Sequence, residues 1–260
     1  DNDFKCPITC YGFGYQLNSP LLDSISKITG GDGYSFIPDS SLLGNVFIHG
    51  ISNFLVTAAT DTIITINLKR GVRFEDGSQF KEVPINSLKY GQDKNLLFKV
   101  GGDDDFNDFA EVTLQMNQVL IPAGDVEVPE INYFNEVLYR YKGFSIINEC
   151  LQLQKYNESE KVKQLINPFI ASMKGDLSLK ASQFIQDMII DLEGQVKEAL
   201  NMTSQGQRED WFTKWGQHYL LSLSGAYSNE LCNNFKDKGI SHFGGKTFNK
   251  LRDEVSDIFD

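Results

Sequence analysis

The first 60 residues alternate between short apolar stretches and amphipathic stretches, and this order constrains the fold more than any other feature of the chain. Residues 7–13 (PITCYGF) and 34–37 (YSFI) are short and apolar, as expected of strands that are buried on both faces. Each is followed by a stretch with apolar residues at helical spacing, 19–29 and 42–58. The order strand, helix, strand, helix predicts a parallel, doubly wound sheet.

Cap residues bound these helices. Asn18 or Ser19 can cap the first helix, with Pro20 in its first turn, and Gly30 with the following glycine ends it. The apolar stripe of the first helix is expected to comprise Leu21, Leu22, Ile25 and Ile28. The stripe of the second helix lies on one side, so this helix is expected to pack on the sheet.

From Asp61 the apolar period changes from helical to alternating. The stretch TIITINLKR places Ile64, Ile66 and Leu68 on one face of a strand, and EVTLQM does the same with Val112, Leu114 and Met116. A third strand is expected at residues 95–100 (NLLFKV), and polar turn sequences separate the strands. Residues 61–129 therefore predict a small antiparallel β-sandwich.

From residue 130 the chain is helical and predicts an antiparallel bundle. Residues 182–200 repeat apolar side chains at close to heptad spacing, and Pro168 is expected to kink or divide the helix before them. The fold class is therefore α+β in three parts: residues 1–60 as a partial doubly wound (Rossmann-like) segment, 61–129 as the β-sandwich, and 130–260 as the helical bundle.

Two blocks of the sequence resemble a known family. YGFGY and SFIPDSSLLGNVF near the start, with KWGQHYL and CNNFKDKGI near the end, are similar to intracellular proteins that join a von Willebrand factor A (VWA) domain to an intein-like Hint domain. The resemblance implies that residues 1–60 are the closing part of a VWA domain and that the rest is the region linking it to the Hint domain.

The resemblance carries no metal site over to this chain. VWA domains hold a divalent ion through a DxSxS motif after their first strand, and the sequence contains no such motif in the right place. We therefore expect no cofactor in this segment, and a divalent metal only where the N-terminal part of the VWA domain is present. Ligands of doubly wound folds bind beyond the carboxyl ends of the strands, so Tyr15 and Asn18 are the residues expected to face a partner there.

Other motifs indicate little chemistry. Asp103, Asp104, Asp105 and Asp108 form an acidic turn that is a weak calcium candidate, because the spacing of an EF-hand loop is not met. His218 lies in WGQHYL among aromatic residues, which favours internal packing over catalysis. Nothing in the sequence pairs a nucleophile with a base, so we expect no enzyme.

The composition limits the classes of partner and the cellular compartment that we expect for this protein. The net charge of −11 argues against nucleic acid, and no apolar run is long enough for a membrane span. Four widely spaced cysteines indicate free thiols in a reducing compartment. These features predict an intracellular protein, in the cytoplasm or in an organelle-bound assembly.

Three hypotheses about function follow. The first is a non-enzymatic protein-interaction or scaffold module within a larger assembly. The broken edge of its VWA sheet would expose apolar surface, and the N-terminal remainder of the domain or another subunit would complete it. The second is an inert linking region of a self-processing (Hint) or ubiquitin-linked polypeptide. The third is a calcium-regulated binding module that uses the acidic turn.

Overall fold

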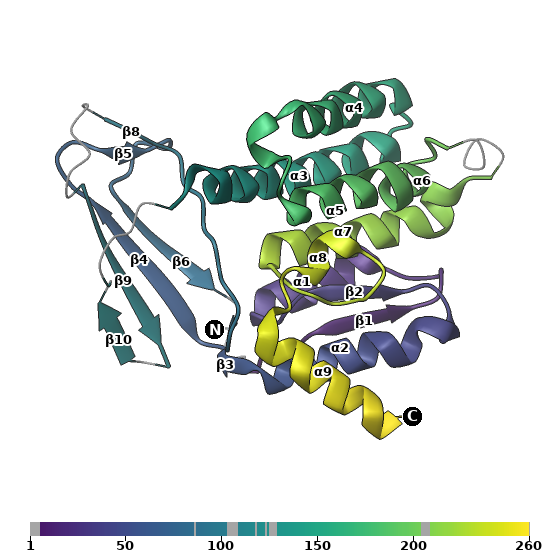
Figure 1. Cartoon of the computed structure of the whole chain (residues 1–260), viewed down its shortest axis with the longest axis horizontal. Coiled ribbons are helices and arrows are strands. Elements are labelled where there is room, and N and C mark those ends of the chain that lie inside the picture. Colours follow the sequence, from purple (N-terminus) through teal and green to yellow (C-terminus); the bar gives the residue numbers. More distant parts are fainter. Residues whose placement is uncertain are drawn as a thin grey trace.

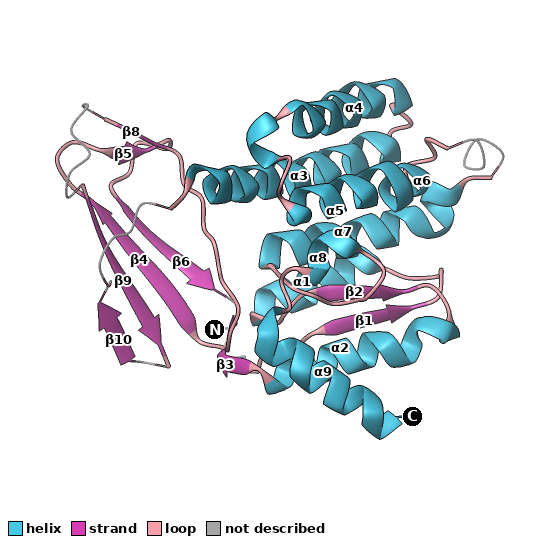
Figure 2. Cartoon of the chain, in the orientation of Figure 1, coloured by secondary structure: helices cyan, strands magenta, loops and turns pink. Residues whose placement is uncertain are grey.

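The computed structural model describes residues 6–85, 87–102, 109–117, 119–122, 124, 129–203 and 209–259, except for the side chains of Pro122 and Phe259. Figure 1 shows a region of antiparallel strands on one side and, on the other, a layer of helices above a two-stranded sheet. Helices and strands occupy separate parts of the chain after the first sheet (Figure 2). The α+β class expected from the sequence is confirmed.

The chain opens with the predicted strand–helix–strand–helix unit. Its elements are β1 (Cys10–Phe13), α1 (Ser19–Thr29), β2 (Tyr34–Ile37), a 3₁₀ turn (Ser40–Leu42) and α2 (Leu43–Leu55). β1 and β2 pair in parallel, with Cys10 opposite Tyr34. The predicted caps are confirmed, because Asn18 Oδ1 accepts a hydrogen bond from Leu21 N and Gly30 ends α1 in the left-handed conformation with φ 71°.

The expected apolar stripe of α1 is partly wrong. Leu21 and Ile28 are 54% and 72% exposed, whereas Leu22 and Ile25 pack against the main core. The buried face of α1 carries serines instead, and Ser26 Oγ accepts a hydrogen bond from a backbone amide in the turn before β2. Hydrogen-bonded hydroxyl groups are tolerated inside a protein, so the buried face is more polar than the pattern predicts.

The described residues in the middle of the chain form three small antiparallel sheets. Their strands are β3 (Thr57–Ala59), β4 (Thr62–Leu68), β5 (Arg73–Phe74), β6 (Phe80–Ile85), β7 (Leu88–Lys89), β8 (Val100–Gly101), β9 (Ala110–Met116) and β10 (Val119–Pro122). The largest sheet has the order β10-β9-β4-β6, and β3 pairs with β7 and β5 with β8. The predicted face of β4 is confirmed, since Ile64, Ile66 and Leu68 pack in one apolar cluster with Phe74 of β5.

Two strand assignments in this region differ from the expectation. Residues 95–100 form a regular strand only at their end, in β8, and the rest is held by side chains of the helical half. The pattern also missed β6, which contains Pro84 opposite Ile63 of β4. Proline lacks the amide that a central strand needs, and β6 accepts it because it is an edge strand of its sheet.

Helices fill the second half of the chain, as the sequence predicts. They are α3 (Ile131–Lys155), α4 (Ser159–Gly175), a 3₁₀ turn (Leu177–Leu179), α5 (Gln183–Asp191), a π-helical turn (Leu192–Val196), α6 (Lys197–Ala199), a second π-helical turn (Phe212–Gly216), α7 (Gln217–Asn229), α8 (Lys238–Ser241) and α9 (Gly245–Phe259). Pro168 does not divide α4, which runs through it. Within the described ranges, no helix is both long and apolar enough to cross a bilayer.

The first and last parts of the chain share one core. Cys10 of β1 and Phe36 of β2 belong to the same buried cluster as Ile147, Leu192 and Leu220 of the helices. α7 packs on β2 and on α1, and α9 lies along α2 on the opposite face of the sheet (Figure 1). The domain boundaries near residues 60 and 130 stay a prediction, but residues 6–58 are stabilised by contacts with residues far along the chain.

Replacing Gly31 by alanine is expected to reduce the free energy of unfolding by roughly 1–3 kcal/mol, because the added carbon overpacks a backbone contact. A Cβ at Gly31 would lie 2.0 Å from the carbonyl oxygen of Ile8, just before β1. Gly44→Ala is the control, since a Cβ there meets nothing within 4 Å, and alanine in a helix should stabilise α2 slightly. Urea unfolding of both variants tests this; equal midpoints would contradict it.

Candidate functional site

The loop after β1 holds the two residues that the sequence singles out as facing a partner. Tyr15 is 44% exposed, and its carbonyl oxygen accepts a hydrogen bond from His218 Nε2 at 3.2 Å. The side-chain oxygen of Asn18 is used in capping α1, at 3.2 Å from Leu21 N. Contact between Tyr15 and a partner therefore stays a prediction, and Asn18 has a structural task already.

A chain of buried hydrogen bonds joins this loop to α7. Ser19 Oγ lies 2.6 Å from His218 Nδ1 and 2.7 Å from the hydroxyl of Tyr34. A carbonyl oxygen only accepts, so the contact with Tyr15 assigns the proton to His218 Nε2; Nδ1 then accepts from Ser19, which accepts from Tyr34. Burial lowers the pKa of His218, and the hydrogen bond to Tyr15 partly offsets this.

This chain of hydrogen bonds has the composition of a catalytic pair but the setting of a structural link. Ser19 and His218 are only 1% and 4% exposed, and the hydroxyl of Ser19 and both ring nitrogens of His218 have hydrogen-bond partners. A nucleophile must be within reach of its substrate. The internal packing predicted for WGQHYL is therefore confirmed, with His218 as its polar member.

β1 forms an open edge of the parallel sheet. Cys10 N donates to the carbonyl oxygen of Gly33, the residue before β2, and because residues alternate in a parallel ladder, the amides of Tyr11 and Phe13 point the other way. The part of the chain that the structure describes supplies no hydrogen-bond partner for these two amides. The outer edge of β2 is different, because α7 covers it and Ser222 Oγ accepts from Phe36 N at 3.2 Å.

Apolar side chains are exposed beside this open edge. Phe13 is 54% exposed, and on α2 Phe47, Ile51 and Phe54 are 43%, 37% and 77% exposed. The spacing of the three α2 residues places them on one stripe of the helix. A cavity of about 340 Å³ between β1 and α2 is lined in part by this stripe. We call Phe13, Phe47, Ile51 and Phe54 the edge surface; it is the exposed apolar border that the sequence predicts.

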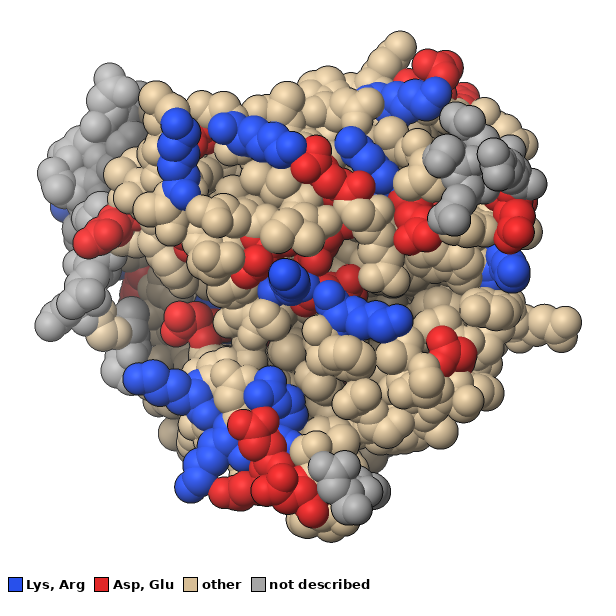
Figure 3. All heavy atoms as spheres, turned by 45° about the vertical axis from the view of Figure 1, so that its right-hand side comes forward, with Lys and Arg blue, Asp and Glu red and all other residues tan. Residues whose placement is uncertain are grey.

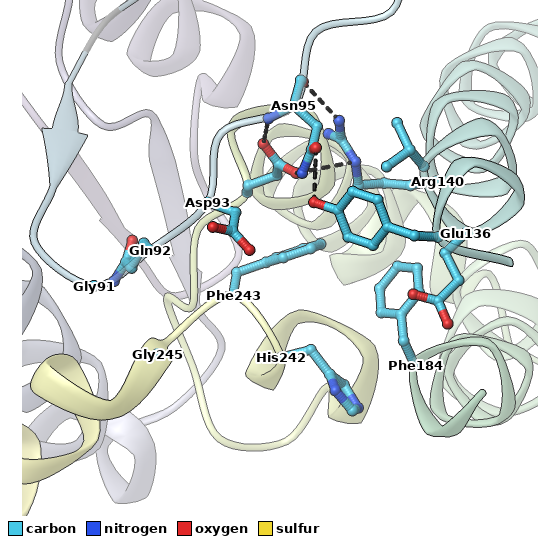
Figure 4. Close-up of a pocket in the computed structure, with 13 residues that line it drawn as sticks. Gly91, Gln92, Asp93, Asn95, Glu136, Arg140, Phe184, His242, Phe243 and Gly245 are labelled. Atoms are coloured by element: carbon cyan, nitrogen blue, oxygen red, sulfur yellow. Dashed lines mark hydrogen bonds and ion pairs between the residues drawn. The ribbon is translucent and has the colours of Figure 1, made fainter. Parts of the chain in front are cut away.

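A second candidate site is a cavity of about 240 Å³ between the strands and the helices, shown in Figure 4. Segments far apart in the sequence line it: the loop before β8, α3, the start of α5, the residue after α7 and the turn between α8 and α9. Its walls combine the aromatic rings of Tyr133, Phe184 and Phe243 with the carboxyl groups of Asp93 and Glu136. We call this cavity the inter-element pocket.

The inner wall of the inter-element pocket is a buried ion pair. Arg140 and Glu230 are 1% and 6% exposed, and Arg140 Nε lies 3.4 Å from Glu230 Oε1. Arg140 also donates to the carbonyl oxygens of Tyr227 and Asn95, at 2.7 and 2.9 Å. Glu230 accepts from the amide and the side chain of Asn95, at 2.6 and 2.8 Å. This network ties the segment before β8 to α3 and to the end of α7.

Sequence reasoning missed Arg140 and Glu230. A signal for Arg140 exists, since it lies three residues after Val137 and seven before Ile147, on the apolar side of its helix. Long charged side chains often leave such positions by extending to solvent. Only the fold shows that this guanidinium group meets a carboxylate 90 residues away.

The structure brings no metal site together in the part it describes. The predicted calcium candidates Asp103, Asp104, Asp105 and Asp108 lie outside the described residues. Among the residues that are described, no three His, Cys, Asp or Glu side chains are arranged to hold a metal ion. The loop after β1 does not fit a metal either, because the oxygen of Asn18 is engaged.

Surface charges and cysteines agree with the composition. On the face shown in Figure 3, basic and acidic side chains lie beside one another, and a group of adjoining basic side chains at the lower left borders acidic ones. All four cysteines are free, with Cys6 exposed and the other three buried.

Comparison with known families identifies one region of the chain. Residues 182–257 match the family described as VWA / Hh protein intein-like, which confirms the family that the C-terminal block resembles. The match spans α5 to α9, including α7, which packs on β2 and α1, and α9, which packs on α2. It indicates a protein-interaction module and no more specific role. No curated protein and no solved structure matches the chain.

Proposed function

We propose that this chain is a VWA-type protein-interaction module without catalytic activity of its own, working as a subunit or fragment of a larger assembly. The observation that carries the proposal is the open edge of β1 beside the exposed edge surface. The family match over residues 182–257 supports it, because that region holds the β1–β2 sheet in place.

The physical argument concerns what covers a parallel sheet. Such sheets occur almost only where helices cover both faces, and an unpaired edge presents free amide and carbonyl groups to any extended chain. Exposed apolar surface beside an open edge commonly marks a protein–protein contact. The occupant we propose is a parallel strand with its flanking helix, from the N-terminal part of a VWA domain in the same polypeptide or from another subunit.

A lack of catalysis is part of the proposal. The Ser19–His218 pair is sealed from solvent and already satisfied. Free cysteines support an intracellular assembly, because disulfides are rare in reducing compartments.

The intein-like description of the matching family favours a second candidate function. In this alternative, the chain is the linking region of a self-processing polypeptide. The sequence of the full-length gene distinguishes the interaction module from the linking region, because a Hint segment beyond these residues would support the linking role.

Photo-crosslinking tests the edge surface directly. Benzoylphenylalanine in place of Phe54, in cells that express the protein, is expected to crosslink to one defined segment of one partner. The control places the same group at Tyr156, at the end of α3, because both side chains are 77% exposed. Equal yields from the two positions would contradict the proposal.

A second pair of variants tests strand pairing at the same edge. Phe13→Pro removes the outward amide of β1 and is expected to reduce the Phe54 crosslink roughly tenfold, since edge pairing depends on main-chain hydrogen bonds. Phe13→Val keeps that amide and should retain the crosslink. Crosslinking that survives Phe13→Pro would show that the partner does not pair with β1.

A further inference from the structure

We propose that the docking of helix α9 on α2 is an acid-sensitive switch, in which His49 of α2 senses the pH. In this switch α9 stays docked while His49 is neutral and leaves α2 when His49 takes up a proton. The two helices lie along one another in Figure 1. His49 is two residues from both Phe47 and Ile51, so it faces away from the edge surface. The inference therefore does not depend on the proposed function.

α9 is held against the rest of the protein by a small apolar cluster. Phe248 is fully buried and packs with Val56, just after α2, and with Cys232, in the segment after α7, while Leu251 lies beside them. As far as the chain is described, the large cluster that joins the first sheet to the helices contains no residue of α9. The side chains of α9 form ion pairs and hydrogen bonds only with one another in these same ranges. A helix held in this way can open without unfolding of the whole protein.

His49 lies in the contact between the two helices with one ring nitrogen unpartnered. The residue is 3% exposed, and its ring centre is 5.8 Å from that of Phe248. Nδ1 is 2.7 Å from the carbonyl oxygen of Asn45, which can only accept, so Nδ1 carries the proton. Nε2 is buried and has no hydrogen-bond partner among the residues that the structure describes. A proton on Nε2 would create a buried N–H without an acceptor, and such donors are rare in folded proteins.

The groups around His49 also disfavour a positive charge on its ring. Burial is the main cause that lowers the pKa of His49; the hydrogen bond to Asn45 partly offsets this, and the charge of Arg252 on α9 lowers the pKa further. α2 carries no other ionisable side chain. Burial raises the pKa of the Cys232 thiol to about 12, so that this group stays neutral. Asp253 pairs with Arg252 at 2.7 Å, but no carboxylate in the described part of the chain acts on His49 itself.

The direction of the switch follows from proton binding. The pKa of His49 is lower in the docked state than in the released state, where the ring returns to water and to the ordinary value of about 6.5. The released state therefore binds a proton more readily. Below this value, each unit of pH favours release by up to about tenfold. At neutral and alkaline pH both states are neutral, and the apolar contacts keep α9 docked.

Hydrogen exchange of the whole chain, followed by mass spectrometry, tests the proposal. After correction for the intrinsic exchange rate, the opening constant of α9 is expected to rise several-fold between pH 7.5 and pH 5.0. The upper limit is about 30-fold, which applies if His49 is neutral in the docked state at both pH values. α7 belongs to the main core and serves as the reference in the same sample, where its opening constant should not follow that of α9.

Two histidine variants assign the pH dependence to one residue. His49→Gln removes the group that takes up the proton and is expected to abolish the pH dependence of α9 opening. His218→Gln is the matched control, because His218 is also buried and its pKa is also lowered, but it lies between α7 and the loop after β1. The pH dependence of α9 opening should survive in this control.

Each outcome decides the question. An opening constant of α9 that stays level with pH, an equal rise for α7, or a pH dependence that persists in His49→Gln would overturn the proposal. Imidazole signals in NMR spectra provide a second measurement on the unaltered protein, which has three histidines, so a variant that fails to fold cannot obscure the result. Titration of His49 together with the opening of α9 supports the switch, and titration at the ordinary pKa with α9 still docked would overturn it.

Discussion

Replacing Arg140 by methionine is expected to lower the free energy of unfolding by about 3–5 kcal/mol, the usual loss when one partner of a buried ion pair is removed. The variant leaves Glu230, which is 6% exposed, as a buried charge that has lost its ion-pair partner and keeps its hydrogen bonds from Asn95. It also removes the hydrogen bonds that Arg140 donates to the carbonyl oxygens of Tyr227 and Asn95, although Asn95 keeps the one from the hydroxyl of Tyr141. Urea unfolding, followed by circular dichroism of the helices, measures the change.

Two further variants distinguish the effect of breaking a buried ion pair from the effect of removing any positive charge. Arg140→Met combined with Glu230→Gln should recover part of the stability, because the second substitution removes the unpaired charge. Lys163→Met on α4 breaks an exposed ion pair, in which the side chains of Lys163 and Glu160 are 43% and 79% exposed. This substitution is expected to change the free energy of unfolding by at most ~1 kcal/mol. If Arg140→Met lowered the free energy of unfolding by no more than Lys163→Met does, the buried ion pair would not be what holds the segment before β8.

Regular burial made the periodic parts of this fold predictable. Apolar spacing predicts a helix over residues 182–200, and Ile185, Met188, Leu192 and Val196 are each at most 1% exposed. The pairing of β1 with β2 followed from the order of elements, since a strand–helix–strand unit must place its strands in parallel. In both cases a single local period records which side of an element faces the core.

Buried polar residues were not predictable, because their partners are distant in sequence. Ser19 reads as a helix cap, yet its hydroxyl meets His218 199 residues away. Residues 95–100 read as a strand, but Asn95 is bonded to Glu230 and the amide of Leu97 to Tyr141, so side chains replace a ladder. Local sequence carries no trace of such pairs, and only the packed chain shows them.

The two candidate sites also differ in how far the sequence predicts them. The edge surface was foreseen, because a doubly wound unit with only two strands must leave an edge uncovered. Its exact position on Phe13 and on one stripe of α2 required the structure. The inter-element pocket was not foreseen, since segments from loop, helices and turn meet in it and none carries a motif.

The stability of the protein is expected to depend on pH through the buried carboxyl group of Asp191. Its oxygens accept from Lys238 N, Gly239 N and the hydroxyl of Tyr227, at 3.0, 2.7 and 3.1 Å, and hold the start of α8 and the end of α7 against α5. Burial, and next the charge of Asp237, raise the pKa of Asp191 from 3.8 to about 7, and these hydrogen bonds offset only part of the rise.

The sign of this effect follows from proton binding. Between about pH 4 and 7 the folded protein holds a proton on Asp191 that the unfolded chain has lost, so stability falls as the pH rises through this range. His49 and His218 act in the opposite direction: burial lowers the pKa of both, so their contribution is lost as the pH falls below about 6.5. Their effects cancel when a variant is compared with the unaltered protein at each pH.

Asp191→Asn provides that comparison, because asparagine mimics the neutral carboxyl group. From pH 5 to pH 8 the stability of the variant is expected to rise relative to the unaltered protein by about 2–3 kcal/mol, with each unit of pKa difference worth about 1.4 kcal/mol. Urea unfolding at pH 5, 6, 7 and 8 measures the difference. Asp257→Asn, at an exposed carboxylate of α9, should show no such trend. A flat difference for Asp191→Asn would mean that this carboxyl group is ionised in the folded protein throughout the range, and that the start of α8 tolerates a buried charge beside it.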